Sequence, residues 1–508
     1  MSSEKIDRMC EYRRMRIDKQ MTLQTIFREL RVCWARFAES MAAVSAEFHL
    51  PPRIFHTLSA IHNPSAAASK IPNSSTVHCP LFTIRFPLPP SRARRRPGEG
   101  EALHLPPSTL CLALLLCLLP GMLWADTHTW TGGAGAGNYL ATTPANWGGV
   151  APETNDDIVL NATSSSNMTW NMTNMTVASW RQVGYLGTVT VTTVSGGSGF
   201  TNLNIAGNCV ISNGVWTHQA NTGGAIEMDC LRVTIGGSLA MGSNGVIDVT
   251  RKGYSDFPGP DGDKSLSGPG VGGNGYGASH GGRGSVWFGG PSRPCYGSIV
   301  APTNFGSGGW NAVGAGAVQL TVRGTVRYDG LLAANGWTGI NRSDSSGGSI
   351  LLTAGALSGA GTIQANGVSY SGGGRVALAV TNAGANFLGF TGAISAYGGA
   401  GSDIPGAGTV YLRTADQGIY EGTLIVDNSN VVNNVCGTEI NSNVTDTVVG
   451  DVIIRNGGCL RMTNQSLTVS GIWSNRAGFV SEWGSRVIFA GVATSTIYGS
   501  NTFMGLIC

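Results

Sequence analysis

Apolar and polar residues alternate in short runs along the second half of the chain, and each run ends at a glycine or an asparagine. A pattern of glycine followed by apolar residues at its third and fifth positions begins at residues 330, 361, 392, 422 and 450. The steps between successive copies are therefore 31, 31, 30 and 28 residues. Alternation with a period of two places both apolar positions on one face of a β-strand. The copies read GLLAANG, GTIQANG, GAISAYG, GTLIVDN and GDVIIRN.

A second alternating strand precedes each of the first four copies, at 317–322, 349–354, 375–380 and 409–414. Between the two strands, apolar residues recur at constant intervals of 31, namely Val326, Leu357, Leu388 and Ile419. Three short apolar strands in each repeat, separated by glycine-containing corners, predict an all-β fold: a parallel β-helix (solenoid) with coils of about 30 residues. A two-sheet sandwich also has short strands, but it would not produce a repeated step of 31.

The repeat also indicates how the chain is organised. Residues 126–252 fit the pattern more loosely and are predicted to be an N-terminal solenoid segment. Residues 253–316 interrupt it as a glycine-rich excursion, and residues 317–508 form the regular coils. The last coil ends on an apolar stretch with no polar cap to protect its edge, so we expect this segment to be truncated.

Composition separates the chain into two unlike parts. Of its 508 residues, 75 are glycine and only 12% are charged, yet 42% are hydrophobic, which indicates a packed protein. Residues 1–125 contain 16 Lys+Arg and 9 Asp+Glu, whereas residues 126–508 contain 16 and 20. The net charges are therefore +7 and −4. Because no basic surface is left in the second part, nucleic acid is excluded as a partner.

A secretory signal peptide is predicted at 91–125. A basic stretch (SRARRRPGEG) is followed by an apolar run (LCLALLLCLL) and then by PGMLWA, with cleavage expected after Ala125. A membrane anchor is the rival interpretation, but the apolar run is shorter than the roughly 20 residues that span a bilayer. Residues 1–90 precede the signal, and we interpret them as a mis-assigned start or as a disordered leader with one short helical pattern. We therefore expect a secreted or bacterial cell-surface protein.

Six cysteines follow the signal, and none forms a CxxC pair, which argues against zinc and thioredoxin-like chemistry. Cys209 and Cys230 are 21 residues apart, and Cys436 and Cys459 are 23 apart. Disulfides between neighbouring coils and buried free thiols both fit these spacings.

The glycine-rich excursion carries the candidate binding residues. Its aromatic rings could stack on sugars, or they could simply cover the solenoid, since scattered aromatic residues are common on protein surfaces. Weak carbohydrate binding is the most that this composition supports. The candidate residues are Tyr276, His280, Arg283, Trp287, Tyr296 and Trp310.

Several stretches resemble a known class of proteins. The opening TWTGGAGAGNYLATTPANWGGVAPETNDDIVL and the later GGSILLTAGALSGAGTIQANG and GAGTVYLR are similar to large secreted bacterial surface proteins with autotransporter-associated β-strand repeats. The resemblance covers about residues 129–508, and it implies export and a glycine-rich solenoid. Unlike a full autotransporter, this sequence shows no C-terminal membrane barrel.

No residue set identifies a reaction. The sequence contains no HExxH motif, and GGAGSD at 398–403 is a single copy of a calcium-type turn, so we predict no catalytic residues, no cofactor and no metal. A polysaccharide lyase or glycoside hydrolase on a β-helix is the alternative to a structural or adhesive protein. Its candidate residues fall at different phases of the repeat, and they are Asp329, Asp344, Arg375, Asp403 and Asp416. The expected partner is an extracellular polysaccharide or the cell envelope, and the oligomeric state is left open.

Overall fold

The computed structural model describes residues 76–79, 82–85, 125–196, 199–257, 263–273, 276–285, 293–339, 344–400, 404–432 and 436–508. The chain divides into two compact units, Met1–Leu110 and Cys111–Cys508. In the first unit, β1 (Thr76–Cys79) pairs with β2 (Phe82–Arg85) in antiparallel orientation. The rest of the predicted leader, and the predicted signal peptide up to residue 124, lie outside the described residues.

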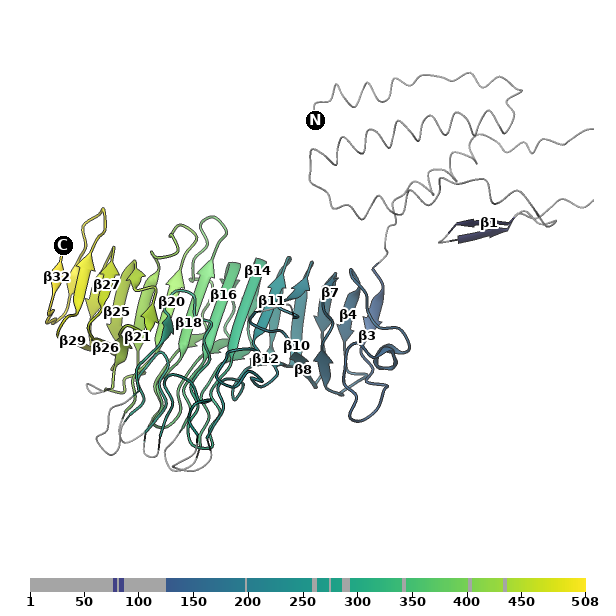
Figure 1. Cartoon of the computed structure of the whole chain (residues 1–508). Coiled ribbons are helices and arrows are strands. Elements are labelled where there is room, and N and C mark those ends of the chain that lie inside the picture. The colour runs from purple at the N-terminus through teal and green to yellow at the C-terminus, as the bar shows by residue number, and fades with distance from the viewer. Residues whose placement is uncertain are drawn as a thin grey trace, which may run out of the picture. The chain divides into compact units, whose positions relative to one another are not determined.

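The second unit is nearly all β, with long parallel sheets (Figure 1). The short 3-10 helix η2 (Pro144–Trp147) interrupts the strands near the start of this unit. The all-β prediction is therefore confirmed. Val, Ile, Leu and Thr at alternating positions favour extended backbone, and glycine and asparagine end each strand because they tolerate the corner conformations.

The strands of this unit align in three parallel series. The first contains β3 (Thr127–Thr129), β4 (Asp157–Leu160), β7 (Ser179–Gln182), the first halves of β10 (Cys209–His218) and β12 (Leu239–Asp248), and the last residues of β14 (Ala317–Tyr328) and β16 (Ser349–Ser358). The second contains β5 (Met168–Trp170), β8 (Thr188–Val191), the second halves of β10 and β12, β15 (Leu331–Ala333), β17 (Thr362–Gln364) and β19 (Ala393–Ser395). The third contains β6 (Thr176–Val177), β9 (Leu203–Ile205), β11 (Leu231–Ile235), the first halves of β14 and β16, β18 (Arg375–Val380) and β20 (Thr409–Arg413).

The register within these series follows the sequence repeat. In the second series Leu332 lies beside Ile363, and Ile363 lies beside Ile394. In the third series, one row of aligned residues contains Val318, Ile350, Val376 and Val410. This register confirms the predicted alignment of the strands that precede the first four glycine-led copies. Like residues therefore stack on like, and the stacked side chains form one continuous apolar core.

The predicted third apolar position is wrong in two of its four repeats. Val326 and Leu357 are paired and buried, but Leu388 is 87% exposed and Ile419 is 54% exposed. β18 ends at Val380, and the chain loops outward before Phe390 bridges Gly359 and becomes buried in the place expected for Leu388. A constant spacing of 31 therefore did not preserve the inward orientation at this corner.

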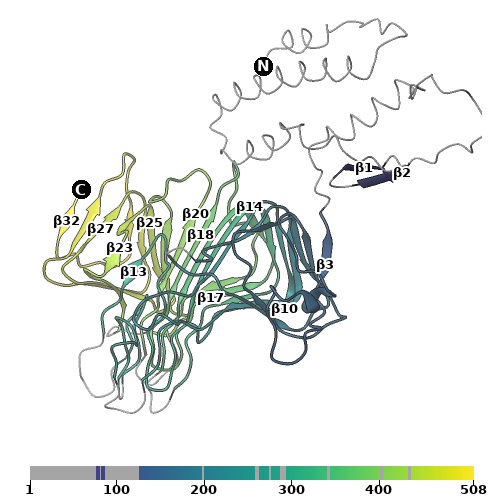
Figure 2. The same cartoon turned by 45° about the vertical axis from the view of Figure 1, so that its right-hand side comes forward.

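The three series together form the first stack, whose last strand is β20. There β21 (Thr423–Asp427) pairs with β20 in antiparallel orientation, and a second stack of parallel strands follows (Figure 2). Its strands are β22 (Thr438–Ile440), β24 (Val448–Val449), β25 (Asp451–Arg455), β26 (Cys459–Met462), β27 (Ser466–Val469), β28 (Trp473–Asn475), β29 (Gly478–Ser481), β30 (Arg486–Phe489), β31 (Ile497–Tyr498) and β32 (Leu506–Ile507).

The second stack has a core of its own. Leu424 lies beside Val452, as the repeat predicted, and Val452 lies beside Trp473. This core also includes Ala377 of β18 and Tyr411 of β20, whose neighbours in sequence face the first core. The two cores therefore lie on opposite faces of β18 and β20, which explains why the RVALAV strand is almost continuously apolar.

The glycine-rich excursion packs against both stacks. Its short strand β13 (Gly297–Ser298) pairs with β23 (Val444–Thr445) of the second stack. Its backbone also binds the loops of the first stack, for example through Gly281 N donating to Gly373 O at 2.9 Å. Among the described residues, no helix is long and apolar enough to cross a membrane.

Candidate functional site

The residues predicted to bind carbohydrate are divided between interior and surface. His280 and Tyr296 are buried, with ring centroids 4.7 Å apart. The Tyr296 hydroxyl donates to Phe305 O at 2.7 Å, and His280 Nδ1 lies 2.8 Å from Gly347 O. Burial lowers the pKa of His280 to about 3 and so keeps the imidazole neutral. Neither ring is accessible for stacking on a sugar.

The other members of this set lie nearer to solvent. Tyr276 and Trp310 are half-buried, and Arg283 forms an ion pair with the buried Glu439, with 3.5 Å between Nη1 and Oε1. Trp287 lies outside the described residues. The structure therefore does not gather the described members of this set around one accessible surface, although binding by the half-buried ones remains a prediction.

The five candidate catalytic residues have separate environments. Arg375 is buried and donates to Tyr296 O and to Thr409 Oγ1, both at 2.9 Å, and burial lowers its pKa to about 10. Asp344 is buried and accepts a hydrogen bond from Gly339 N at 3.0 Å. Arg375 thus fastens the excursion to β20, a role that leaves it out of reach of a polymer.

The carboxylates outside the core show no catalytic arrangement. Asp329 accepts from Arg327 Nε at 2.7 Å, a hydrogen bond that lowers the pKa of Asp329 and keeps it ionised. Asp416 is exposed, and Asp403 lies outside the described residues. A general acid requires a carboxyl whose pKa is raised. Burial raises the pKa of Asp344, but that side chain is enclosed.

Of the two alternatives left open for the cysteines after the signal, the structure shows buried thiols and not disulfides between neighbouring coils. Cys209, Cys230 and Cys459 are buried thiols outside any disulfide, so neither the Cys209/Cys230 nor the Cys436/Cys459 bridge is present. Burial raises the pKa of the Cys230 thiol to about 11 and that of Cys295 to about 12. Protonated thiols of this kind are inert packing groups.

A pocket of about 180 Å³ lies where the two stacks meet, and the sequence did not indicate it. Its lining is divided about evenly between apolar and polar surface, and the polar part includes Tyr397, Asp427 and Arg455. Arg455 Nε donates to Asp427 Oδ2 at 2.8 Å. Burial, followed by the nearby Asp427 carboxylate, raises the pKa of Tyr397. The apolar part of the lining comes from Phe387, Phe390, Ile394, Val410, Leu412 and Ile425.

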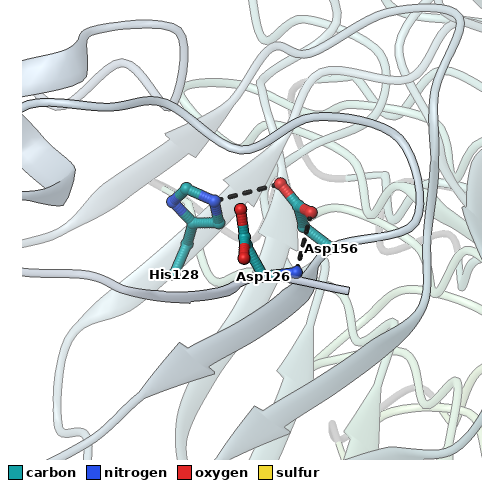
Figure 3. A group of neighbouring side chains, drawn as sticks. All are labelled: Asp126, His128 and Asp156. Carbon is teal, nitrogen blue, oxygen red and sulfur yellow. Dashed lines mark hydrogen bonds and ion pairs between the residues drawn. The ribbon is translucent and has the colours of Figure 1, made fainter. Parts of the chain in front are cut away.

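A second candidate site is a cluster of three side chains beside β3, the first strand of the first series. The ligand atoms of Asp126, His128 and Asp156 all lie within 4.8 Å of one another (Figure 3). His128 Nε2 is 3.0 Å from Asp156 Oδ2, and the backbone nitrogen of Asp126 donates to Asp156 Oδ1 at 3.1 Å. One imidazole and two carboxylates are a donor set suited to a divalent transition metal.

The repeat itself could have revealed this cluster. β3 pairs with β4 so that Thr127 lies beside Asp157, a step of 30 residues, and this register places Asp126 next to Asp156. Asp126 and His128 are two residues apart, so their side chains leave the strand on the same face. No metal site was predicted here because the coils before residue 253 match the repeat only loosely, so their register is not evident from the 31-residue step.

Comparison with protein-family models, with curated proteins and with solved structures finds no match for this chain.

Proposed function

We propose that the chain is exported and that its mature part is a parallel β-solenoid with a structural or adhesive role outside the bacterial cell. The observation that carries this proposal is the repeated parallel register. Leu331 lies beside Thr362, and Thr362 beside Ala393, at steps of 31 residues in one series. A body built from such coils grows by adding repeats and needs no globular core, which suits a protein that extends from a surface.

The resemblance to secreted surface proteins with autotransporter-associated repeats points in the same direction. So does the predicted signal peptide, after which the first paired strand begins at Thr127, two residues beyond the expected cleavage position. The alternative, a lyase or hydrolase on the same scaffold, requires accessible carboxylates or an accessible basic residue in one groove. Its best candidates, Arg375 and Asp344, are buried.

Within this proposal, glycan contact belongs to the pocket at the junction of the two stacks. An aromatic and aliphatic lining can cover the apolar face of a sugar ring, and a few directed polar groups at the edge fix its orientation. Tyr397 supplies a hydroxyl, and Asp427 and Arg455 supply a carboxylate and a guanidinium held 2.8 Å apart. The half-buried Tyr276 and Trp310 are a second and weaker candidate surface.

The test is incubation of the exported protein, with calcium, on a panel of acidic and neutral polysaccharides. Retention on the polymer and the appearance of new reducing or unsaturated ends are both followed. We expect retention without cleavage, weakened by Tyr397→Ala and by Arg455→Ala and unchanged by Asp416→Asn, an exposed control outside the pocket lining. Cleavage products that disappear on substitution of Asp329, Asp344 or Asp416 would support the enzyme instead.

A further inference from the structure

The cluster of Asp126, His128 and Asp156 lies directly beside the expected cleavage position. Ala125 and Asp126 are exposed, so the bond between them is accessible in the folded unit. The nitrogen of that bond is the one that donates to Asp156 Oδ1 at 3.1 Å. Export would therefore release an amine inside the cluster and not at a distance from it.

We propose that signal-peptide removal creates a transition-metal site at the new amino terminus. Its ligands are the α-amine and side-chain carboxylate of Asp126, Nε2 of His128 and a carboxylate oxygen of Asp156. This inference rests on the proposed export, because the uncleaved chain has a protonated amide nitrogen in place of the amine, and such a nitrogen has no lone pair available to a metal. Metal binding displaces a proton from the terminal ammonium group to solvent.

The donor set selects the class of metal. Two nitrogens and two carboxylate oxygens suit Cu²⁺, Ni²⁺ and Zn²⁺, whereas Ca²⁺ and Mg²⁺ prefer all-oxygen shells. For a given set of nitrogen and oxygen ligands, Cu²⁺ binds most tightly in the first-row series. The site is therefore assigned to Cu²⁺ first and to Zn²⁺ with lower affinity.

The fold holds these ligands in place before the metal arrives. Asp157 N donates to Asp126 O at 2.8 Å, which fixes the terminal residue in the parallel pairing of β3 with β4. The edge of Trp147 packs on the His128 ring at a centroid distance of 6.3 Å. Asp156 is itself oriented by Glu153 N, which donates to Oδ2 at 2.7 Å. Orientation of ligands by a surrounding shell raises metal affinity.

The proposed site differs from a simpler way in which the same amino terminus could bind copper. A flexible Asp-Thr-His terminus can wrap Cu²⁺ with its amine, two backbone nitrogens and the imidazole, and it needs no other residue. In the folded chain the β3 backbone is engaged in the sheet, and His128 directs Nε2 to Asp156. Dependence on Asp156 therefore distinguishes the site built by the fold from the flexible chelate.

The experiment uses the exported protein, whose first residue is determined by amino-terminal sequencing. Cu²⁺ and Zn²⁺ affinities are measured by competition titration, and the copper environment by electron paramagnetic resonance. We expect a chain that starts at Asp126 and shows two nitrogen donors on copper. Asp156→Asn and His128→Ala should each weaken binding at least about 10- to 100-fold, the loss caused by changing even an outer-shell partner. Asp416→Asn is the matched control, and thermal unfolding verifies that each variant is folded.

A second variant isolates the amine. Insertion of one alanine between Ala125 and Asp126 yields a processed chain whose amine is displaced from the cluster, and it should lose affinity as Asp156→Asn does. Undiminished Cu²⁺ binding by Asp156→Asn, with four nitrogen donors, would identify the flexible chelate and overturn the inference. A chain that starts at Asp126 but does not bind Cu²⁺ overturns the inference and leaves export intact. A mature chain that starts at another residue overturns the inference alone, whereas a chain that is never recovered outside the cell overturns export as well.

Discussion

At the scale of single residues, alignment in a series decides what each apolar side chain contributes. Ile363 is fully buried between Leu332 and Ile394 and has a stacking neighbour on each side. Leu388 has the same chemistry and is almost fully exposed. Each fully buried aliphatic side chain contributes roughly 1.5–3 kcal/mol relative to an exposed one. The two residues therefore differ in energetic role although the repeat predicts an inward orientation for both.

A pair of aspartate substitutions measures that difference. Ile363→Asp should lower the free energy of unfolding by about 3–5 kcal/mol, because it places an uncompensated charge in the core. Leu388→Asp should change it by no more than about 0.5 kcal/mol, as is usual for surface positions. Urea unfolding of the two variants beside the parent protein gives both values. Equal losses at the two positions would contradict the assigned orientation of this corner.

At the scale of elements, the glycine-rich segments allow one stretch of backbone to pack directly against another. Gly372 N donates to Ala278 O at 2.9 Å, and Gly406 N donates to Arg283 O at 2.8 Å, so the excursion is bonded to two successive loops of the first stack. A Cβ on Gly372 would overlap Gly282 O, which leaves glycine as the residue that fits there. The sequence predicts an excursion at 253–316. The sequence did not predict which loops the excursion contacts. A run of glycines has no periodic apolar side chains, so its sequence does not show how it aligns with a neighbouring segment.

Close packing of this kind makes a single methyl group costly. Gly372→Ala should destabilise the protein by about 1–3 kcal/mol, the usual effect of overpacking. The control is Gly196→Ala, where no atom lies within 4 Å of the added Cβ. That variant should be neutral or stabilised by up to about 1 kcal/mol, because alanine restricts the unfolded chain. Thermal and urea unfolding compare the two, and a neutral Gly372→Ala would show that the loops separate at little cost.

At the scale of the whole second unit, the shortening of the repeat marks a structural boundary. The step falls from 31 to 30 and then to 28 residues, and the antiparallel β20–β21 pair lies in the same region. The repeat could predict strands, their alignment and most inward residues on either side of this point. It could not predict that the chain reverses there, because alternation has the same form in parallel and antiparallel neighbours. The pocket depends on that reversal, so it was not predicted either.

Two cores that share strands only where the stacks meet, at β16, β18, β20 and β21, should open separately. Trp473 is fully buried in the second core, with Phe479 and Phe503 at centroid distances of 4.9 and 5.5 Å. Trp473→Ala should remove about 3–5 kcal/mol of local stability. Stacked repeats interact mainly with their neighbours, so the loss should stay within the second stack. Amide hydrogen exchange should then show faster exchange across 423–508 with protection retained across 126–380.

Trp180→Ala, which removes the middle ring between Trp170 and Trp216 in the first core, should give the reverse pattern. Uniform loss of protection in both variants would instead mean that the two stacks unfold as one cooperative body.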